Sequence, residues 1–416
     1  MNTDSREIRM TLFSLCLLIF IDSIGIGLIY PVMPKLFLDP INGLLKGTSF
    51  FSRDMLYGIA FSVFPLMGFF SMPLFGAFSD SFGRRRMLLI GVGGLVLSYA
   101  LTALSVLLHS YSGFIIGRIV GGISIGTFTI ANASVADISH DAKNKLKNFR
   151  WPILASVGGY ILGPAISSLL DFIYIPFKLT APFIIATILS FINWIMLFQT
   201  FKETRETDTE KRNLINECKE KLSSIFFVIK ENRIRSFVIS CCFLYFGFGL
   251  VTQTISLYLA KFFNYTPGAI GVFFIIMGLV MSFSSFCIQP LLYNRFDYRK
   301  LIFINMVLMG ILLLFQFTCS LIYIKESLFT IWFVSVLSYI ALPFVTLGYT
   351  TLFSELISKD NQGKIMGGLG QVYSAMFFIS ALFIGYLMSG HESLVFLFSG
   401  LSILIASVIF KIKKWD

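Results

Sequence analysis

Long apolar segments alternate with short polar segments along the whole chain. A helix that crosses a membrane needs roughly 20 mostly apolar residues, and each apolar segment is about that long. The twelve segments cover approximately residues 8–33, 54–78, 87–108, 112–136, 151–170, 181–201, 234–260, 267–292, 301–322, 328–353, 364–389 and 391–411. The pattern predicts an all-α integral membrane protein with twelve transmembrane helices.

The composition supports a membrane protein. Of the 416 residues, 56% are hydrophobic and 13% are charged. A soluble domain has about 25% charged residues, so this chain cannot build a solvated surface of ordinary size. We therefore expect the lipid bilayer to cover much of the exterior.

The cations follow the polar segments. The formal net charge is +11, and most of the 33 Lys and Arg residues lie in alternate polar segments, among them 84–86 and 202–235. Because cytoplasmic loops carry an excess of Lys and Arg, we expect both termini in the cytoplasm. No basic face or binding motif accompanies the charge, which argues against nucleic acid as a partner.

The longest polar segment divides the chain into two sets of six apolar segments. We predict an N-terminal six-helix bundle at 1–201, a cytoplasmic connecting loop at 202–233 and a C-terminal six-helix bundle at 234–416. A short repeat supports the division, because the pattern at 138–145 recurs at 357–364 in the corresponding loop of the second set. Two such halves around a central cavity are typical of a transporter that binds its substrate near the membrane midplane.

Motifs for other kinds of chemistry are absent from the sequence. The six Cys residues form no CxxC pair and no Cys/His cluster, so we expect no metal site. No GxxxxGK[ST] loop occurs, which excludes direct use of ATP by this chain. We therefore expect a protein that is not an enzyme and that needs no cofactor.

Two ionisable residues lie inside apolar segments. Asp22 is in the middle of the first, and Arg118 is the one cation within a span. Such groups normally face a cavity or a partner and mark proton or substrate pathways. A carboxyl group there can carry a proton because desolvation disfavours its charged form. The structural alternatives are a packing hydrogen bond for Asp22 and an Arg118 side chain that extends towards the interface.

Four motifs resemble those of major facilitator superfamily transporters, and more narrowly the twelve-span drug:proton antiporters of the tetracycline-efflux group. Residues 76–85 (GAFSDSFGRR) are similar to the loop 2–3 signature, and 22–34 (DSIGIGLIYPVMP) resemble the first helix of tetracycline exporters. Residues 117–122 (GRIVGG) resemble the fourth-helix arginine motif, and 159–164 (GYILGP) the fifth-helix motif of antiporters. The resemblance covers the whole chain and is strongest in its first half.

The chain departs from the family pattern at two places. Ser167 and Ser168 stand where the fifth-helix motif usually continues with a glycine pair, and the ninth span (301–322) has no Asp or Glu. Tetracycline exporters carry an acidic residue in that helix, so the second departure argues against tetracycline itself as the substrate.

The resemblance implies roles for several residues. It implies proton coupling by Asp22 and Arg118, and a salt-bridge latch at the cytoplasmic side that stabilises one conformer. The latch residues are Gly76, Asp80, Gly83, Arg84 and Asp137. The alternative for the arginines is that they set the topology alone.

Small and polar residues suggest two further parts. Gly159, Gly163 and Pro164 allow close helix packing and a bend in the fifth helix, either as a gate or as packing alone. Uncharged polar residues at mid-span positions are candidates for the substrate cavity: Asn132, Gln253, Asn305, Gln316 and Gln371.

The leading hypothesis is a proton-coupled antiporter that exports a small organic compound, drug-like or endogenous, across a bacterial cytoplasmic membrane by alternating access. We expect a monomer driven by the proton gradient. Two alternatives stay open, a metabolite or siderophore transporter in either direction and a non-transporting membrane sensor.

Overall fold

The computed structural model describes residues 3–45, 50–138, 142–174, 177–204, 214–231, 234–322, 327–356 and 362–412. These residues are helices and short connections, without a strand among them. Twelve helical segments in the described residues are long and apolar enough to cross a membrane, which confirms the predicted fold class and helix count. The cytoplasmic location of both termini stays a prediction.

The chain forms two compact units. Unit 1 contains residues 1–47, 63–223 and 267–272, and unit 2 contains 48–62, 224–266 and 273–416. Two helices thus begin in one unit and continue in the other. The predicted bundles at 1–201 and 234–416 stay a prediction. Residues 139–141 and 357–361, at the centre of the predicted repeat, lie outside the described residues.

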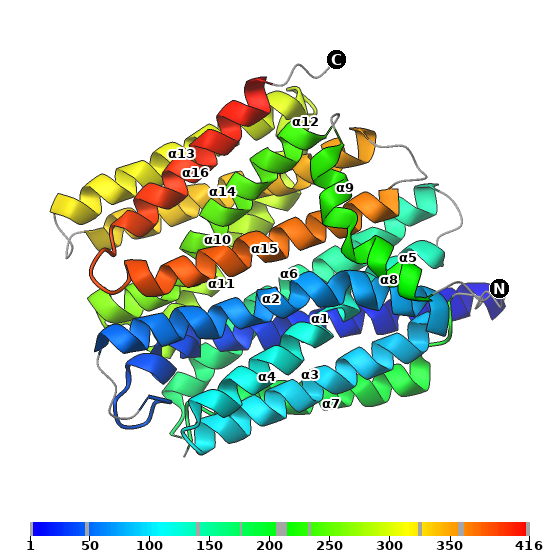
Figure 1. Cartoon of the computed structure of the whole chain (residues 1–416), viewed down its shortest axis with the longest axis horizontal. Helices are drawn as coiled ribbons and strands as arrows, with labels where there is room; N and C mark the ends of the chain where they lie inside the picture. The colour runs from blue at the N-terminus through cyan, green and yellow to red at the C-terminus, as the bar shows by residue number, and fades with distance from the viewer. Residues whose placement is uncertain are drawn as a thin grey trace. The chain divides into compact units, whose positions relative to one another are not determined.

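Unit 1 is built on α1 and α3. Its helices are α1 (Thr3–Leu38), the larger part of α2 (Phe50–Phe82), α3 (Arg84–Leu107), α4 (Tyr111–Ser124), α5 (Thr127–Asp137), α6 (Ala142–Phe172), α7 (Ala181–Thr200) and α8 (Leu214–Leu222). Helix α1 packs against α6 and α7, and α3 packs against α4 and α7 (Figure 1). A fully buried apolar cluster, including Leu18, Leu88 and Ile130, joins α1, α3 and α5.

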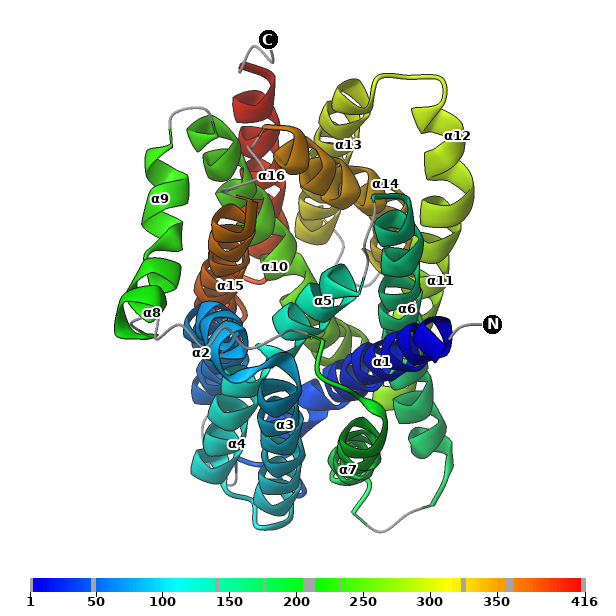
Figure 2. The same cartoon turned by 90° about the vertical axis from the view of Figure 1, so that its right-hand side faces the viewer.

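Unit 2 is built on α10 and α13. Its helices are α9 (Ser224–Lys230), α10 (Arg235–Phe263), most of α11 (Pro267–Phe283), the π-helical turn η1 (Ser284–Ile288), α12 (Gln289–Tyr293), α13 (Tyr298–Ile322), α14 (Ser327–Leu356), α15 (Gln362–Leu387) and α16 (Leu394–Ile412). Helix α10 packs against α15 and α16, and α13 packs against α14 and α16 (Figure 2). The short α9 lies along α15.

Glycine residues allow α1 and α6 to pack closely in unit 1. A Cβ atom added to Gly163 of α6 would lie 2.7 Å from Cα of Gly27 in α1, and one added to Gly159 would lie 2.5 Å from the carbonyl oxygen of Phe20. Such distances are too short for a real Cβ, so α1 and α6 touch backbone to backbone. Close approach of this kind is the usual reason for small residues between membrane helices.

Candidate functional site

Asp22 lies on α1 in unit 1, and only one of its two carboxyl oxygens accepts a hydrogen bond among the described residues. Its Oδ2 accepts a hydrogen bond of 3.3 Å from the hydroxyl of Thr127, the first residue of α5. Its Oδ1 is buried and has no hydrogen-bond partner among the described residues. A buried carboxylate oxygen without a donor is costly, and a bound proton removes that cost by neutralising the group.

Arg118 lies on α4 in the same unit, but its contacts differ from those expected. Its guanidinium Cζ is 4.5 Å from the centre of the Phe64 ring, a cation–π contact. Its electrostatic neighbours include Tyr30 and Tyr99. Within the described part of the chain no ion pair joins Arg118 to Asp22. The role of Arg118 and Asp22 in proton coupling therefore stays a prediction.

Tyr99 lies near both Asp22 and Arg118, and the sequence analysis did not identify it. The Tyr99 phenol on α3 is an electrostatic neighbour of both Asp22 and Arg118. A Cβ atom added to Gly25, one turn along α1 from Asp22, would lie 2.4 Å from the Tyr99 hydroxyl. The absence of a side chain at Gly25 thus lets the phenol reach α1. The glycine pair of the first-helix motif was the available signal, but its partner on α3 could not be identified from spacing.

The predicted latch residues come together where α2 ends and α3 begins. Arg84 Nη1 lies 2.8 Å from Asp80 Oδ1, and Arg84 Nε donates to Asp137 Oδ2 at 3.0 Å. Arg84 Nη1 also donates to the hydroxyl of Ser79 at 2.6 Å, and the Arg84 side chain is only 6% exposed. A buried guanidinium with three partners is a costly group to leave unpaired. The structure thus brings Asp80, Arg84 and Asp137 together, and their role as a latch stays a prediction.

The two latch glycines behave differently. Gly83 separates α2 from α3 with φ 92°, a conformation that other residues rarely adopt. A Cβ atom there would also lie 2.6 Å from Oε2 of Glu203. Gly76 lies within α2, and the nearest atom to an added Cβ is Nζ of Lys221 at 3.8 Å, an ordinary contact. Of these two glycines, backbone conformation and packing therefore require a glycine only at position 83.

The connecting segment adds groups to the latch that the sequence analysis did not identify. Lys221 of α8 donates to Asp80 Oδ2, so Asp80 is shared between Arg84 and Lys221. The Glu203 carboxylate accepts the backbone N–H groups of Arg84 and Arg85 at 2.8 and 3.0 Å. An anion at a helix N-terminus is stabilising. The sequence predicted a cytoplasmic connecting loop at 202–233, and only the fold shows that Glu203 and Lys221 contact the predicted latch residues.

Helix α6 carries the predicted gating residues. Gly159 and Gly163 form the close crossing with α1, and Pro164 lies inside α6 with its Cδ 2.8 Å from the Cβ position of Gly27. Ser167, one of the two residues that replace the family's glycine pair, donates to the carbonyl oxygen of Leu28 at 2.6 Å. The residues thus pack α6 on α1, and a gating role stays a prediction.

The candidate cavity residues mostly have hydrogen-bond partners within their own unit. Asn132 and Asn305 donate to the carbonyl oxygen four residues earlier in their own helices. Gln253 is buried and donates to Ser380 at 2.9 Å, and Gln371 accepts from the hydroxyl of Ser224 and the N–H of Ile225 at the start of α9. Contact of these four residues with a substrate stays a prediction.

Gln316 differs from those four amides. It is 1% exposed, and neither its Nε2 nor its Oε1 has a hydrogen-bond partner among the described residues. It lines a small cavity of about 40 Å³ in unit 2, together with Phe248, Ser338 and Tyr339. Gln316 lies in the ninth span, where the family pattern has an acidic residue. The cavity is large enough for a few water molecules.

Comparison with known proteins identifies the family. The sequence profile described as the Major Facilitator Superfamily matches residues 15–367 and 237–415. The chain belongs to the Major Facilitator Superfamily. The transporter is similar to the human organic anion transporter MFSD10 (TETRAN), whose crystal structure superposes with a TM-score of 0.71 at 18% identity over 99% of this chain and 100% of that one. That likeness shows the fold.

Relatives of this chain include bacterial tetracycline resistance proteins. The transporter is 35% identical over 177 residues to the class C tetracycline resistance protein of Escherichia coli, which is 42% of this chain and 41% of that protein. It is 28% identical over 303 residues to the class H protein of Pasteurella multocida, 72% of this chain and 71% of the relative. The class C match thus spans less than half of that protein's length.

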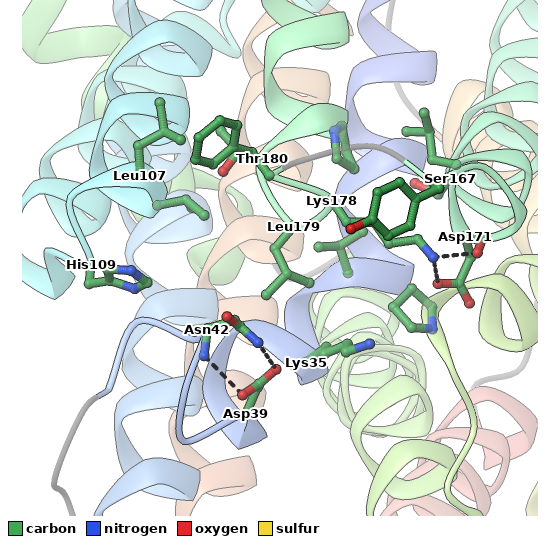
Figure 3. Close-up of a pocket in the computed structure, with 17 residues that line it drawn as sticks. Lys35, Asp39, Asn42, Leu107, His109, Ser167, Asp171, Lys178, Leu179 and Thr180 are labelled. Atoms are coloured by element: carbon green, nitrogen blue, oxygen red, sulfur yellow. Dashed lines mark hydrogen bonds and ion pairs between the residues drawn. The ribbon is translucent and has the colours of Figure 1, made fainter.

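Unit 1 of the transporter also contains a cavity of about 600 Å³ at the end of α1, lined by both polar and apolar side chains (Figure 3). Its lining includes Lys178, whose ammonium lies 3.1 Å from Asp171 Oδ1. Asp39 accepts the backbone N–H groups of Ile41 and Asn42 at 2.9 and 3.0 Å. Burial alone would raise the pKa of Asp39, but these hydrogen bonds, the Asn42 amide and the Lys35 charge together lower it. Asp39 therefore stays ionised near neutral pH.

Proposed function

We propose that this transporter exports a small organic compound in exchange for protons, and that Asp22 carries the proton. The observation that carries the proposal is the Asp22 carboxyl group in α1, with one buried oxygen that lacks a partner among the described residues. The tetracycline resistance relatives support export of a drug-like compound as the class of activity. The ninth span has no Asp or Glu, so the substrate we propose is not tetracycline itself.

In the proposed cycle, Asp22 binds a proton from outside once the substrate has left, and releases it inward when substrate binds. A membrane potential of 100 mV contributes ~2.3 kcal/mol for each charge that crosses. One proton per cycle is thus enough for modest accumulation before any pH gradient is added. We further propose that a monomer works in a bacterial cytoplasmic membrane without a cofactor, since the tetracycline resistance relatives come from bacteria.

The test is transport by purified protein in proteoliposomes. Tetracyclines, fluoroquinolones, cationic dyes and iron chelators are each offered with an imposed proton gradient switched on or off. We expect at least one compound to move uphill only with the gradient, and Asp22→Asn to lose that uphill movement while keeping downhill exchange. Neutral Asn holds the same shape but cannot cycle a proton.

The matched control is Asp39→Asn, which removes a carboxylate that the α1 end holds ionised through backbone hydrogen bonds. It should transport like the unmodified protein. Uphill transport by Asp22→Asn at the rate of the unmodified protein would show that another group carries the proton. Movement that ignores the gradient in every variant would point to facilitated diffusion instead.

A further inference from the structure

Three charged side chains meet in unit 2 near the start of α2, at the opposite end of that helix from Asp80. The ammonium of Lys261, near the end of α10, lies 2.9 Å from Asp54 Oδ2 and 3.2 Å from Glu392 Oε1. Lys261 also donates to the carbonyl oxygen of Met388. Glu392 lies in the connection between α15 and α16. One cation thus joins three segments that are far apart in the sequence.

The cluster has one more carboxylate than it has ammonium groups. The Asp54 side chain is 1% exposed and that of Lys261 is 12% exposed. Asp54 Oδ2 is paired, but Asp54 Oδ1 is buried and has no hydrogen-bond partner among the described residues. Glu392 is an electrostatic neighbour of Asp54 and repels its charged form. Asp54 is buried and shares its one cation with Glu392, whose side chain is 23% exposed. Two carboxylates that share one cation cannot both ionise without cost.

The two titratable residues next to the cluster in the sequence, Arg53 and His391, do not pair with the Asp54 carboxylate in the described residues. Arg53 precedes Asp54 in α2 but is not among the electrostatic neighbours of that carboxyl group. His391 precedes Glu392, and its ring lies 5.7 Å from that of Tyr386. Neither residue forms an ion pair with Asp54 in the described residues. The ion pairs among the described residues thus leave the cluster one positive charge short.

The same turns of α2 are held to unit 2 by packing. The Tyr57 hydroxyl donates to the carbonyl oxygen of Gln253 at 3.3 Å. A Cβ atom added to Gly385 of α15 would lie 2.8 Å from Cα of Met55, so the two backbones touch. Helix α2 leaves unit 2 after residue 62, and Pro65 follows within one turn. Proline removes a backbone hydrogen bond and bends a helix. The charged cluster therefore helps to hold the short segment of α2 that belongs to unit 2 and ends just before Pro65.

We infer that Asp54, Lys261 and Glu392 form a second proton-binding site, separate from Asp22, and that binding of one proton loosens the hold on the start of α2. A proton from hydronium in the solvent forms an O–H bond on the Asp54 carboxylate and leaves a water molecule, and no bond of the protein breaks. The ion pair between Asp54 and Lys261 then becomes a hydrogen bond from the ammonium to a neutral carboxyl group, while Lys261 keeps Glu392 as its charged partner. The role of this site in a transport cycle rests on the proposed function, but proton binding does not.

Infrared difference spectroscopy of the purified protein tests the site without any substrate. A protonated carboxyl group has a carbonyl band that a carboxylate lacks, so titration in detergent reports every carboxyl group that gains a proton, and the band of one residue is identified by the variant that loses it. We expect a band that forms on acidification, disappears in Asp54→Asn and persists in Asp22→Asn. Asp39→Asn is the matched control and should keep the band, since Asp39 is held ionised by its turn.

A second variant, Lys261→Gln, tests the site even if Asp54→Asn fails to fold. Lys261→Gln keeps both carboxyl groups but removes the cation between them. Loss of a cation within about 4 Å makes the charged form less favourable, so the band should form at a pH higher by about 1 unit or more. A band that Asp54→Asn leaves intact, or whose midpoint Lys261→Gln leaves unchanged, overturns the inference.

The outcome separates this site from the proposed function. An Asp54 band in a protein that shows no proton-driven transport would support the site and count against proton-coupled export. Proton-driven transport that needs Asp22, in a protein without an Asp54 band, would support export and overturn the second site.

Discussion

Gly163→Ala is expected to remove most of the folded protein, although alanine is the stronger helix former. The new Cβ would lie 2.6 Å from the carbonyl oxygen of Ile24 and 2.7 Å from Cα of Gly27. Both are backbone atoms of α1, so no side chain can rotate away and the two helices must separate. Overpacking of a well-packed interior costs about 1–3 kcal/mol where side chains can adjust, and more where they cannot.

The matched control is Gly158→Ala in the same helix. An added Cβ there meets only the Phe20 ring, at 3.4 Å. Because alanine is favoured over glycine in a helix interior by about 1 kcal/mol, this variant should be as stable as the parent or slightly more stable. Size-exclusion chromatography of detergent extracts and thermal unfolding measure both. Equal melting temperatures for the two variants would show that α1 and α6 do not cross as described.

Arg84→Gln is expected to lower transport by about 10-fold or more, because one conformer loses the centre of its latch. Removal of one member of a buried ion pair costs about 3–5 kcal/mol when the partner stays charged. Arg84 is the shared partner of Asp80 and Asp137. Asp80 keeps Lys221, so we expect the lower end of that range. Initial rates of transport in proteoliposomes, at matched protein amounts, give the effect.

Arg86→Gln tests whether the arginines serve topology alone. It removes the same charge two residues away, from an exposed side chain. If the positive charge of this segment only sets orientation, the two variants should behave alike. If the latch operates, Arg84→Gln loses transport and Arg86→Gln does not. Equal transport in both variants would leave topology as the role of Arg84.

Much of the architecture could be predicted because it depends on properties that are local in the sequence. The bilayer thickness sets the length of each apolar segment, so the twelve spans follow from hydropathy. The ion pair between Asp80 and Arg84 could be predicted because the two residues are four positions apart in a motif that resembles the family's loop signature, while their role as a latch stays a prediction. Asp22 was identified because a carboxylate in an apolar helix is costly wherever it points.

The remaining features depend on which helix faces lie together, and no local pattern specifies that. Tyr99 is one of 16 Tyr residues, and only the tertiary fold brings its hydroxyl to Gly25, one turn from Asp22. Gln253 and Gln371 were predicted to face a cavity, but their amides bind groups from other helices of unit 2. A mid-span amide needs a partner, and the sequence cannot distinguish a protein partner from a substrate.

The sequence by itself determined the fold class, the number of spans and the family, since these follow from apolar length and from motifs within single segments. The tertiary structure alone decided which charges share a site. Asp54, Lys261 and Glu392 come from three separate segments, and each one looks like an ordinary residue near the end of a span. Coulomb energy depends on distances of a few ångströms, and only the packed helices set those distances.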